Sequence, residues 1–143
     1  MPSENLLNRI LDAPVGQVLD IIKDTLNDNV ELVVIEQNST ADNQFVRKIA
    51  ITTHGLPLIK ADVKFDSAVL PEFIMVEILK KKQGIGTILS ANHIKAIRNI
   101  LYLERNPEEN KALRKYEIIN NEIVWFTISE EIRLGNLDSN KYG

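Results

Sequence analysis

The sequence predicts an α+β fold in which a single antiparallel β-sheet has helices packed against it. Residues 1–30 place apolar side chains at helical spacing, whereas residues 31–133 consist mainly of strand-like runs separated by turn residues. A chain of 143 residues fits one domain. We therefore expect N-terminal helices over residues 1–30, a sheet and helix core over 31–133, and a flexible tail over 134–143.

The composition excludes several kinds of site. At 44% hydrophobic and 26% charged residues, the chain resembles an ordinary soluble globular protein. A net charge of -3 argues against a nucleic-acid partner, which normally requires a basic stripe. The sequence has no cysteine, and its two histidines, His54 and His93, have no partners at ligand or triad spacing. We expect neither a metal site nor a cofactor.

The sequence also predicts a protein without a membrane partner. No apolar run approaches the roughly 20 residues that a spanning helix needs. The N-terminus has no basic leader before an apolar stretch, so no secretory signal is visible. A cytoplasmic location is therefore the expectation.

The first two elements are predicted to be helices. Ser3 is a candidate cap for the first, and Pro14 lies near the start of the second. Their apolar residues recur at helical spacing: Leu6, Leu7, Ile10 and Leu11 in the first, and Val15, Val18, Leu19, Ile22 and Leu26 in the second.

Three strands are expected next. Residues 31–37 are rich in β-branched residues, and residues 38–43 read as a polar loop. Residues 45–52 and 58–65 are two strands joined by a Gly/Pro turn, so they predict a hairpin.

The middle of the chain is less clearly patterned. Pro71 is expected to open a helix, and the Gly-Ile-Gly sequence at residues 84–86 reads as a helix C-cap followed by a sharp turn. Residues 87–104 fit either a helix or a strand that carries an inward Arg98, and the pattern leaves both open. Residues 114–119 and 123–132 then predict a final hairpin.

Two charged residues interrupt apolar strand faces. Arg47 alternates with Phe45, Ile49 and Ile51, and Glu130 alternates with Val124, Phe126, Ile128 and Ile132. Because an unpaired buried charge costs several kcal/mol or more, such groups usually have partners. The pattern therefore predicts either an ion pair between Arg47 and Glu130 or an internal site for a small acidic ligand.

From about residue 31 to 132, the chain resembles the chorismate pyruvate-lyase (4-hydroxybenzoate synthase) family, which shares a fold with the UTRA effector-binding domains of bacterial regulators. The resemblance rests on the order of several short pieces. These are Glu36-Gln37-Asn38-Ser39-Thr40, Val46-Arg47-Lys48-Ile49, Gly55-Leu56-Pro57-Leu58, Gly84-Ile85-Gly86, Arg114-Lys115-Tyr116 and Ile128-Ser129-Glu130.

The resemblance implies an internal ligand cavity with assigned roles. Arg47 would bind a substrate carboxylate, and Glu130 would act as acid or base. Backbone amides near Ile85 and Ser39 would contact the ligand. Arg114 shares a strand face with Tyr116, so it would line the same cavity or lie at the sheet edge in water.

The resemblance also implies a function. It predicts a cofactor-independent carbon–oxygen lyase that eliminates pyruvate from chorismate to give 4-hydroxybenzoate. An arginine suits the carboxylate, because its planar guanidinium pairs bidentately and stays charged when buried. The alternative is a non-catalytic, UTRA-like domain that binds a small acidic or aromatic metabolite.

Overall fold

The computed structural model describes residues 2–135 and residue 137, with side chains from Leu6 onward. The flexible tail predicted over residues 134–143 therefore lies outside the described residues, except for Leu134, Gly135 and Leu137. The helices are α1 (Pro2–Asp12), α2 (Val18–Leu26), α3 (Glu72–Leu79) and α4 (Ile85–Ala91). The strands are β1 (Glu31–Ala41), β2 (Gln44–Thr53), β3 (Leu56–Asp66), β4 (Ile97–Asn106), β5 (Lys111–Asn120) and β6 (Ile123–Arg133).

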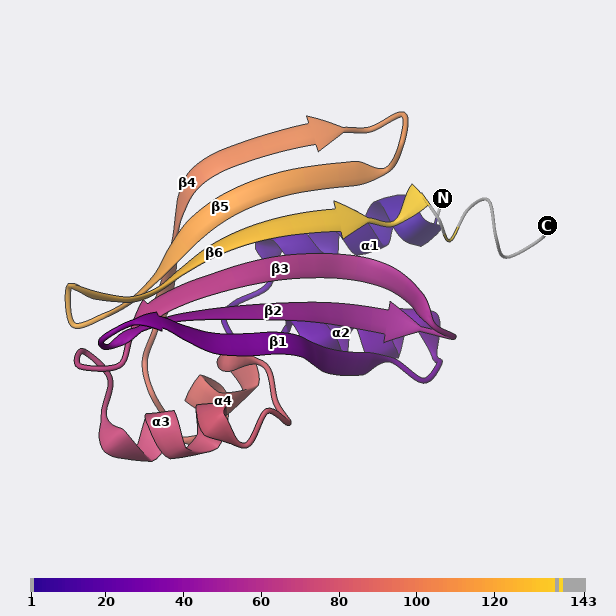
Figure 1. Cartoon of the computed structure of the whole chain (residues 1–143). Coiled ribbons are helices and arrows are strands. Elements are labelled where there is room, and N and C mark those ends of the chain that lie inside the picture. Colours follow the sequence, from indigo (N-terminus) through magenta and orange to yellow (C-terminus); the bar gives the residue numbers. More distant parts are fainter. Residues whose placement is uncertain (1, 136, 138–143) are drawn as a thin grey trace.

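The six strands form one antiparallel sheet in the order β1-β2-β3-β6-β5-β4. Hairpins join β1 to β2, β2 to β3, β4 to β5 and β5 to β6, and the segment with α3 and α4 carries the chain from β3 to the far edge at β4. Figure 1 shows α1 and α2 behind the sheet, and α3 and α4 beside the β1–β2 edge. The predicted α+β fold with one antiparallel sheet is confirmed.

The core lies between the sheet and the helices. Alternation correctly predicted the covered face of β2 and β6, because Ile49, Ile51, Phe126, Ile128 and Ile132 are all buried. Val124 was expected on the same face but is 39% exposed. The β5–β6 pairing shifts by one residue next to Val124, and that shift ends the alternation there.

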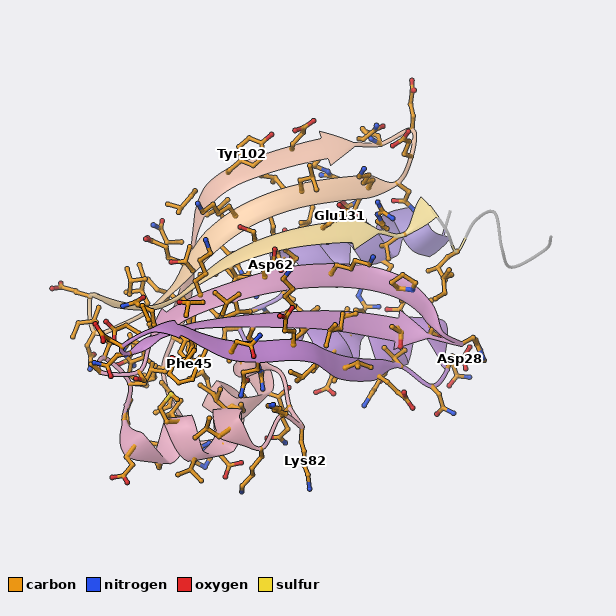
Figure 2. The ribbon with its side chains drawn as sticks, in the orientation of Figure 1. Asp28, Phe45, Asp62, Lys82, Tyr102 and Glu131 are labelled. Atoms are coloured by element: carbon orange, nitrogen blue, oxygen red, sulfur yellow. The ribbon has the colours of Figure 1, made fainter. Side chains whose placement is uncertain are left out.

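The other face of the sheet is polar and uncovered by helices. Asp62, Tyr102 and Glu131 lie on this face, which Figure 2 turns toward the viewer. One buried and one solvated face is the usual arrangement for an antiparallel sheet.

The prediction of a polar loop over residues 38–43 is wrong. β1 continues to Ala41, and only Asp42 and Asn43 form the turn. Backbone pairing of Ser39 with Phe45 and of Ala41 with Gln44 extends the hairpin through these polar residues. Their side chains are exposed at the sheet edge, so their polarity does not oppose the strand.

Three helix boundaries also differ from expectation. The second helix begins at Val18 instead of near Pro14, and Ser3 lies inside α1 instead of before it. Gly84 precedes and caps α4, so the Gly-Ile-Gly sequence starts a helix instead of ending one. Residues 87–104 contain both predicted structures, since α4 ends at Ala91 and β4 begins at Ile97.

Candidate functional site

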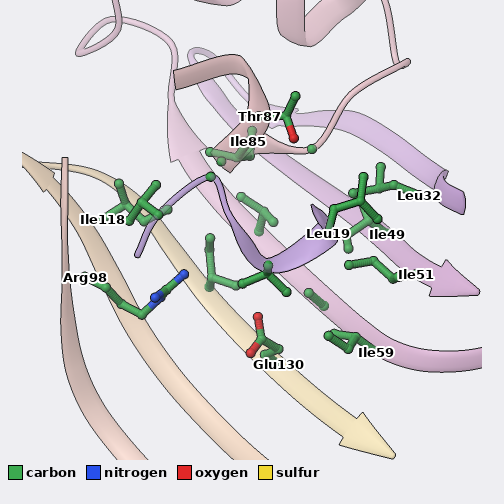
Figure 3. A pocket seen from close by; sticks show the side chains of 18 of the residues that line it. Leu19, Leu32, Ile49, Ile51, Ile59, Ile85, Thr87, Arg98, Ile118 and Glu130 are labelled. Atoms are coloured by element: carbon green, nitrogen blue, oxygen red, sulfur yellow. The ribbon is translucent and has the colours of Figure 1, made fainter. Parts of the chain in front are cut away.

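A cavity of about 90 Å³ lies between the covered face of the sheet and the segments around α2 and α4. Most of its lining is aliphatic, as Figure 3 shows for residues such as Leu19, Ile49 and Ile118. The ionisable groups in its lining are Arg47, Arg98, Tyr116 and Glu130. For comparison, an apolar cavity of about 150 Å³ accommodates benzene. The cavity therefore has room for several waters or a small organic group.

Arg47 is fully buried and has only neutral partners. Its Nε donates to Gln37 Oε1 at 2.8 Å, and its two Nη atoms donate to the carbonyl oxygens of Gln83 at 2.7 Å and Ile78 at 3.3 Å. No carboxylate among the described side chains forms an ion pair with it. Burial lowers the pKa of Arg47 to about 10, so it remains a cation at neutral pH.

Glu130, in contrast, is fully engaged by its own sheet neighbours. Arg114 Nε donates to one carboxylate oxygen at 2.5 Å, and the Tyr116 hydroxyl donates to the other at 2.9 Å. Burial, together with the nearby Glu130 charge, raises the pKa of Tyr116, which keeps the hydroxyl protonated as a donor. Each carboxylate oxygen of Glu130 therefore has a hydrogen-bond donor from β5.

The predicted ion pair between Arg47 and Glu130 is wrong, although both residues line the same cavity. Arg47 pairs across strands with Val63, and Val63 pairs with Ile128, two residues from Glu130. Two strand spacings and two residue steps put their Cα atoms roughly 12 Å apart in a flat sheet. Arg114 lies directly opposite Glu130, which explains why it is the partner.

Arg98 is a second cation in the cavity lining. Its Nη1 donates to the Ala13 carbonyl at 2.5 Å, and its guanidinium carbon lies 4.7 Å from the centroid of the Tyr116 ring. Its Nε is buried and has no hydrogen-bond partner. In Figure 3 the side chain extends from β4 toward the middle of the cavity.

The charges around the cavity do not balance. Arg114 neutralises Glu130. Arg47 and Arg98 form no ion pair with a carboxylate in the described part of the chain. The apolar walls raise the strength of each remaining electrostatic interaction, because the local dielectric constant is lower than that of water. The cavity therefore has an excess of positive charge and attracts an anion.

The other residues selected from the sequence lie at different places. Ile85 lines the cavity at the start of α4. Arg114 is buried beside Glu130 and lies outside the cavity lining, so neither predicted location for it is correct. Ser39 is exposed near the end of β1, and its hydroxyl contacts the Asp42 carbonyl outside the cavity.

Sequence reasoning missed two parts of the site. Gln37, which binds the Nε of Arg47, lies directly opposite it on β1. The register of this hairpin would have indicated Gln37 had the strand been extended correctly. The second part is the connection between α1 and α2, which covers the cavity at Val15 and Gly16. The strand patterns contain no information about this connection.

Within the described residues, no group of three or more His, Cys, Asp or Glu side chains is placed to hold a metal ion. Among the described helices, none combines the length and apolar character needed to cross a bilayer.

No protein-family model matches the chain, and no curated protein matches it. Solved structures do match its fold. The effector domain of PhnF from Mycobacterium smegmatis has a TM-score of 0.58 and 11% identity, covering 85% of this chain and 90% of that chain. A structure of PhnF from the same organism also has a TM-score of 0.58 and 11% identity; 82% of this chain is covered but only 64% of that chain.

A possible transcriptional regulator, YydK from Bacillus subtilis, has a TM-score of 0.51 and 13% identity. The match covers 75% of this chain and 59% of that chain, so this chain spans less than two thirds of the regulator. Together these similarities show the UTRA/chorismate lyase-like fold that the sequence predicted.

The prediction of a cofactor-independent lyase is wrong. The solved structures described above are the effector domain of PhnF and a possible transcriptional regulator, and membership of the chorismate pyruvate-lyase family is not confirmed. Both carboxylate oxygens of Glu130 accept hydrogen bonds within the sheet, one from Arg114 and the other from Tyr116.

Proposed function

We propose that this chain is a non-catalytic, UTRA-like binding domain whose internal cavity holds a small acid, with the acid group at Arg47. The observation that carries the proposal is the buried guanidinium of Arg47, which has neutral hydrogen-bond partners and no counter-charge among the described side chains. A ligand carboxylate would supply that counter-charge.

Arg47 has the donors that such a ligand needs. A guanidinium carries five N–H groups, and three of them bind Gln37, Gln83 and Ile78. The remaining two are available to an acid in the cavity that Arg47 lines. A hydrogen bond to a charged group contributes about 1.5–3 kcal/mol, so two such bonds are enough to select acids over neutral analogues.

The size and walls of the cavity restrict the rest of the ligand. A volume of about 90 Å³ lies below the roughly 300–1,000 Å³ of sites for drug-sized ligands. Aliphatic walls at Leu19, Ile49 and Ile128 favour a short apolar body. Chorismate, a ring with two carboxylates, is larger than the acid that we propose for this cavity.

The similar structures support binding over catalysis. PhnF is represented by its effector domain, and YydK is described as a possible transcriptional regulator. A domain of this kind must hold a ligand without converting it. The complete engagement of Glu130 within the sheet is consistent with that role.

Propanoate is a suitable test ligand, because it has one carboxylate and a short apolar tail. With five non-hydrogen atoms and at most about 1.5 kcal/mol for each, its dissociation constant is expected to be micromolar to millimolar. We expect NMR titration to give saturable binding to the wild-type protein. Arg47→Met should raise the dissociation constant by about tenfold or more, because both charge-assisted hydrogen bonds are lost.

The matched control is Arg133→Met, which removes an exposed arginine paired with Glu131 at the end of β6. This variant should bind propanoate as the wild type does. Equal binding by Arg47→Met and the wild type, or no binding by the wild type, would contradict the proposed function.

A further inference from the structure

A second, larger hollow adjoins the cavity. It is a groove of about 580 Å³ between α2 and α4, with Asp20, Lys23, Lys82, Gln83 and Ser90 in its lining. These residues do not line the inner cavity. The groove and the cavity have five lining residues in common, namely Gly16, Leu19, Leu32, Gly84 and Thr87. The two hollows therefore meet at this ring of residues, which we call the neck.

Two residues of the neck are glycines at which the packing is close. A Cβ atom at Gly84 would lie 2.7 Å from Leu32 Cδ1, so these two residues are in close contact and Leu32 would have to shift to admit a side chain there. A Cβ atom at Gly16 would lie 2.8 Å from the Gly86 carbonyl oxygen, and the positive φ of 92° there also favours glycine. The neck thus consists of backbone at two positions and of side chains at Leu19, Leu32 and Thr87.

Arg47 lies next to this junction. Its Nη1 donates to the carbonyl of Gln83, and Gln83 lines the groove just before Gly84 of the neck. An acid group bound by Arg47 would therefore lie close to the outer groove. The shared lining residues make the groove the nearest space for the remainder of a longer ligand.

We propose that the outer groove is a second subsite, which binds a neutral polar extension of the acid held at Arg47. This inference rests on the proposed function, because it assumes that the acid group occupies the inner cavity. The groove lining contains two lysines, Lys23 and Lys82, and two acids, Asp20 and Glu31, so their formal charges cancel. An amide or hydroxyl group suits this balanced, polar lining better than a second charge.

The volumes support a two-part ligand. The inner cavity alone is smaller than ordinary small-molecule sites, whereas the groove provides the several hundred Å³ typical of them. The cavity lining is mostly apolar and the groove lining mostly polar. The ligand class is thus a small acid with a short apolar segment next to the carboxylate and a hydrogen-bonding extension beyond it.

Two probes with the same head separate the subsites: propanoate, and 3-acetamidopropanoate, which adds a neutral amide to it. We expect the wild-type protein to bind the longer acid about tenfold more tightly, as one or two additional hydrogen bonds would provide. Lys82→Trp would fill the groove, because Lys82 is exposed and lines the groove but not the inner cavity. In this variant the two acids should bind with dissociation constants within about twofold of each other, and that of propanoate should be unchanged.

Lys80→Trp is the matched control, because Lys80 is also an exposed lysine, two residues away, but lies outside both hollows. It should keep the full preference for the longer acid. If the wild type binds both acids equally, or if Lys82→Trp keeps the preference, the second subsite is refuted while the proposed function stands. If the wild type binds neither acid, both proposals are refuted.

Discussion

At the scale of single residues, this protein compensates two buried charges in different ways. Glu130 meets a cation and a hydroxyl from the adjacent strand, so its charge is balanced within the fold. Arg47 meets one amide oxygen and two backbone carbonyls, which satisfy hydrogen bonds without cancelling its charge. The charge of Glu130 is therefore neutralised within the fold, whereas the charge of Arg47 is not neutralised by any described side chain.

The buried pair of Arg114 and Glu130 should be essential for stability. Arg114→Met would leave a carboxylate with 8% side-chain exposure and only Tyr116 as partner. Loss of one partner of a buried pair costs about 3–5 kcal/mol, because the other charge is left uncompensated. We expect a decrease of this size in the free energy of unfolding, measured by urea denaturation.

A neighbouring ion pair provides the control. Arg133 and Glu131 lie on the same strand, but their side chains are 45% and 30% exposed. Arg133→Met should change the free energy of unfolding by at most about 1 kcal/mol. Adding Glu130→Gln to Arg114→Met should recover part of the lost stability. Equal effects of Arg114→Met and Arg133→Met would show that the buried pair has no special role.

At the scale of elements, the cavity depends on the close contact between the α1–α2 connection and α4. Gly16 and Gly86 touch backbone to backbone, since a Cβ atom at either would lie 2.8 Å from an atom of the other. Arg98 holds the same connection to the sheet through the Ala13 carbonyl. These contacts place Val15 and Gly16 over the cavity.

Gly16→Ala should therefore destabilise the protein more than an alanine at an equally unusual backbone position. Its positive φ costs about 1–2 kcal/mol for a residue with a Cβ atom, and the clash with Gly86 and Ser90 adds about 1–3 kcal/mol. Gly55→Ala is the control, because Gly55 also has a positive φ but has no atom within 4 Å of its built Cβ. Urea denaturation should show the larger loss for Gly16→Ala. Equal losses would mean that the contact with α4 is not tight.

At the scale of the whole molecule, the strand patterns predicted the sheet well because alternation reports burial directly. They also identified Arg47 and Glu130 as buried charges. They did not identify the partners, since Gln37 and Arg114 are selected by the exact register of the β1–β2 and β5–β6 hairpins, which alternation within one strand does not specify. Residues 87–104 stayed ambiguous because a short helix and an edge strand follow each other within that range.

The function illustrates a second limit of sequence patterns. The same fold serves enzymes and effector domains, so resemblance in the order of short pieces did not separate them. The contacts of Glu130 depend on the pairing of β5 with β6, which the order of short pieces does not reveal.

The central claim is that the Arg47 guanidinium is the anchor for an anionic ligand. The most direct measurement is the NMR signal of the Arg47 Nη–H groups, which include the two free N–H groups, during titration with propanoate at neutral pH. Our account predicts a saturable shift of this signal, with the same dissociation constant as that of signals from the cavity-lining residues. If propanoate shifts the cavity signals and leaves the Arg47 signal unmoved, the acid binds elsewhere in the cavity and the claim is wrong.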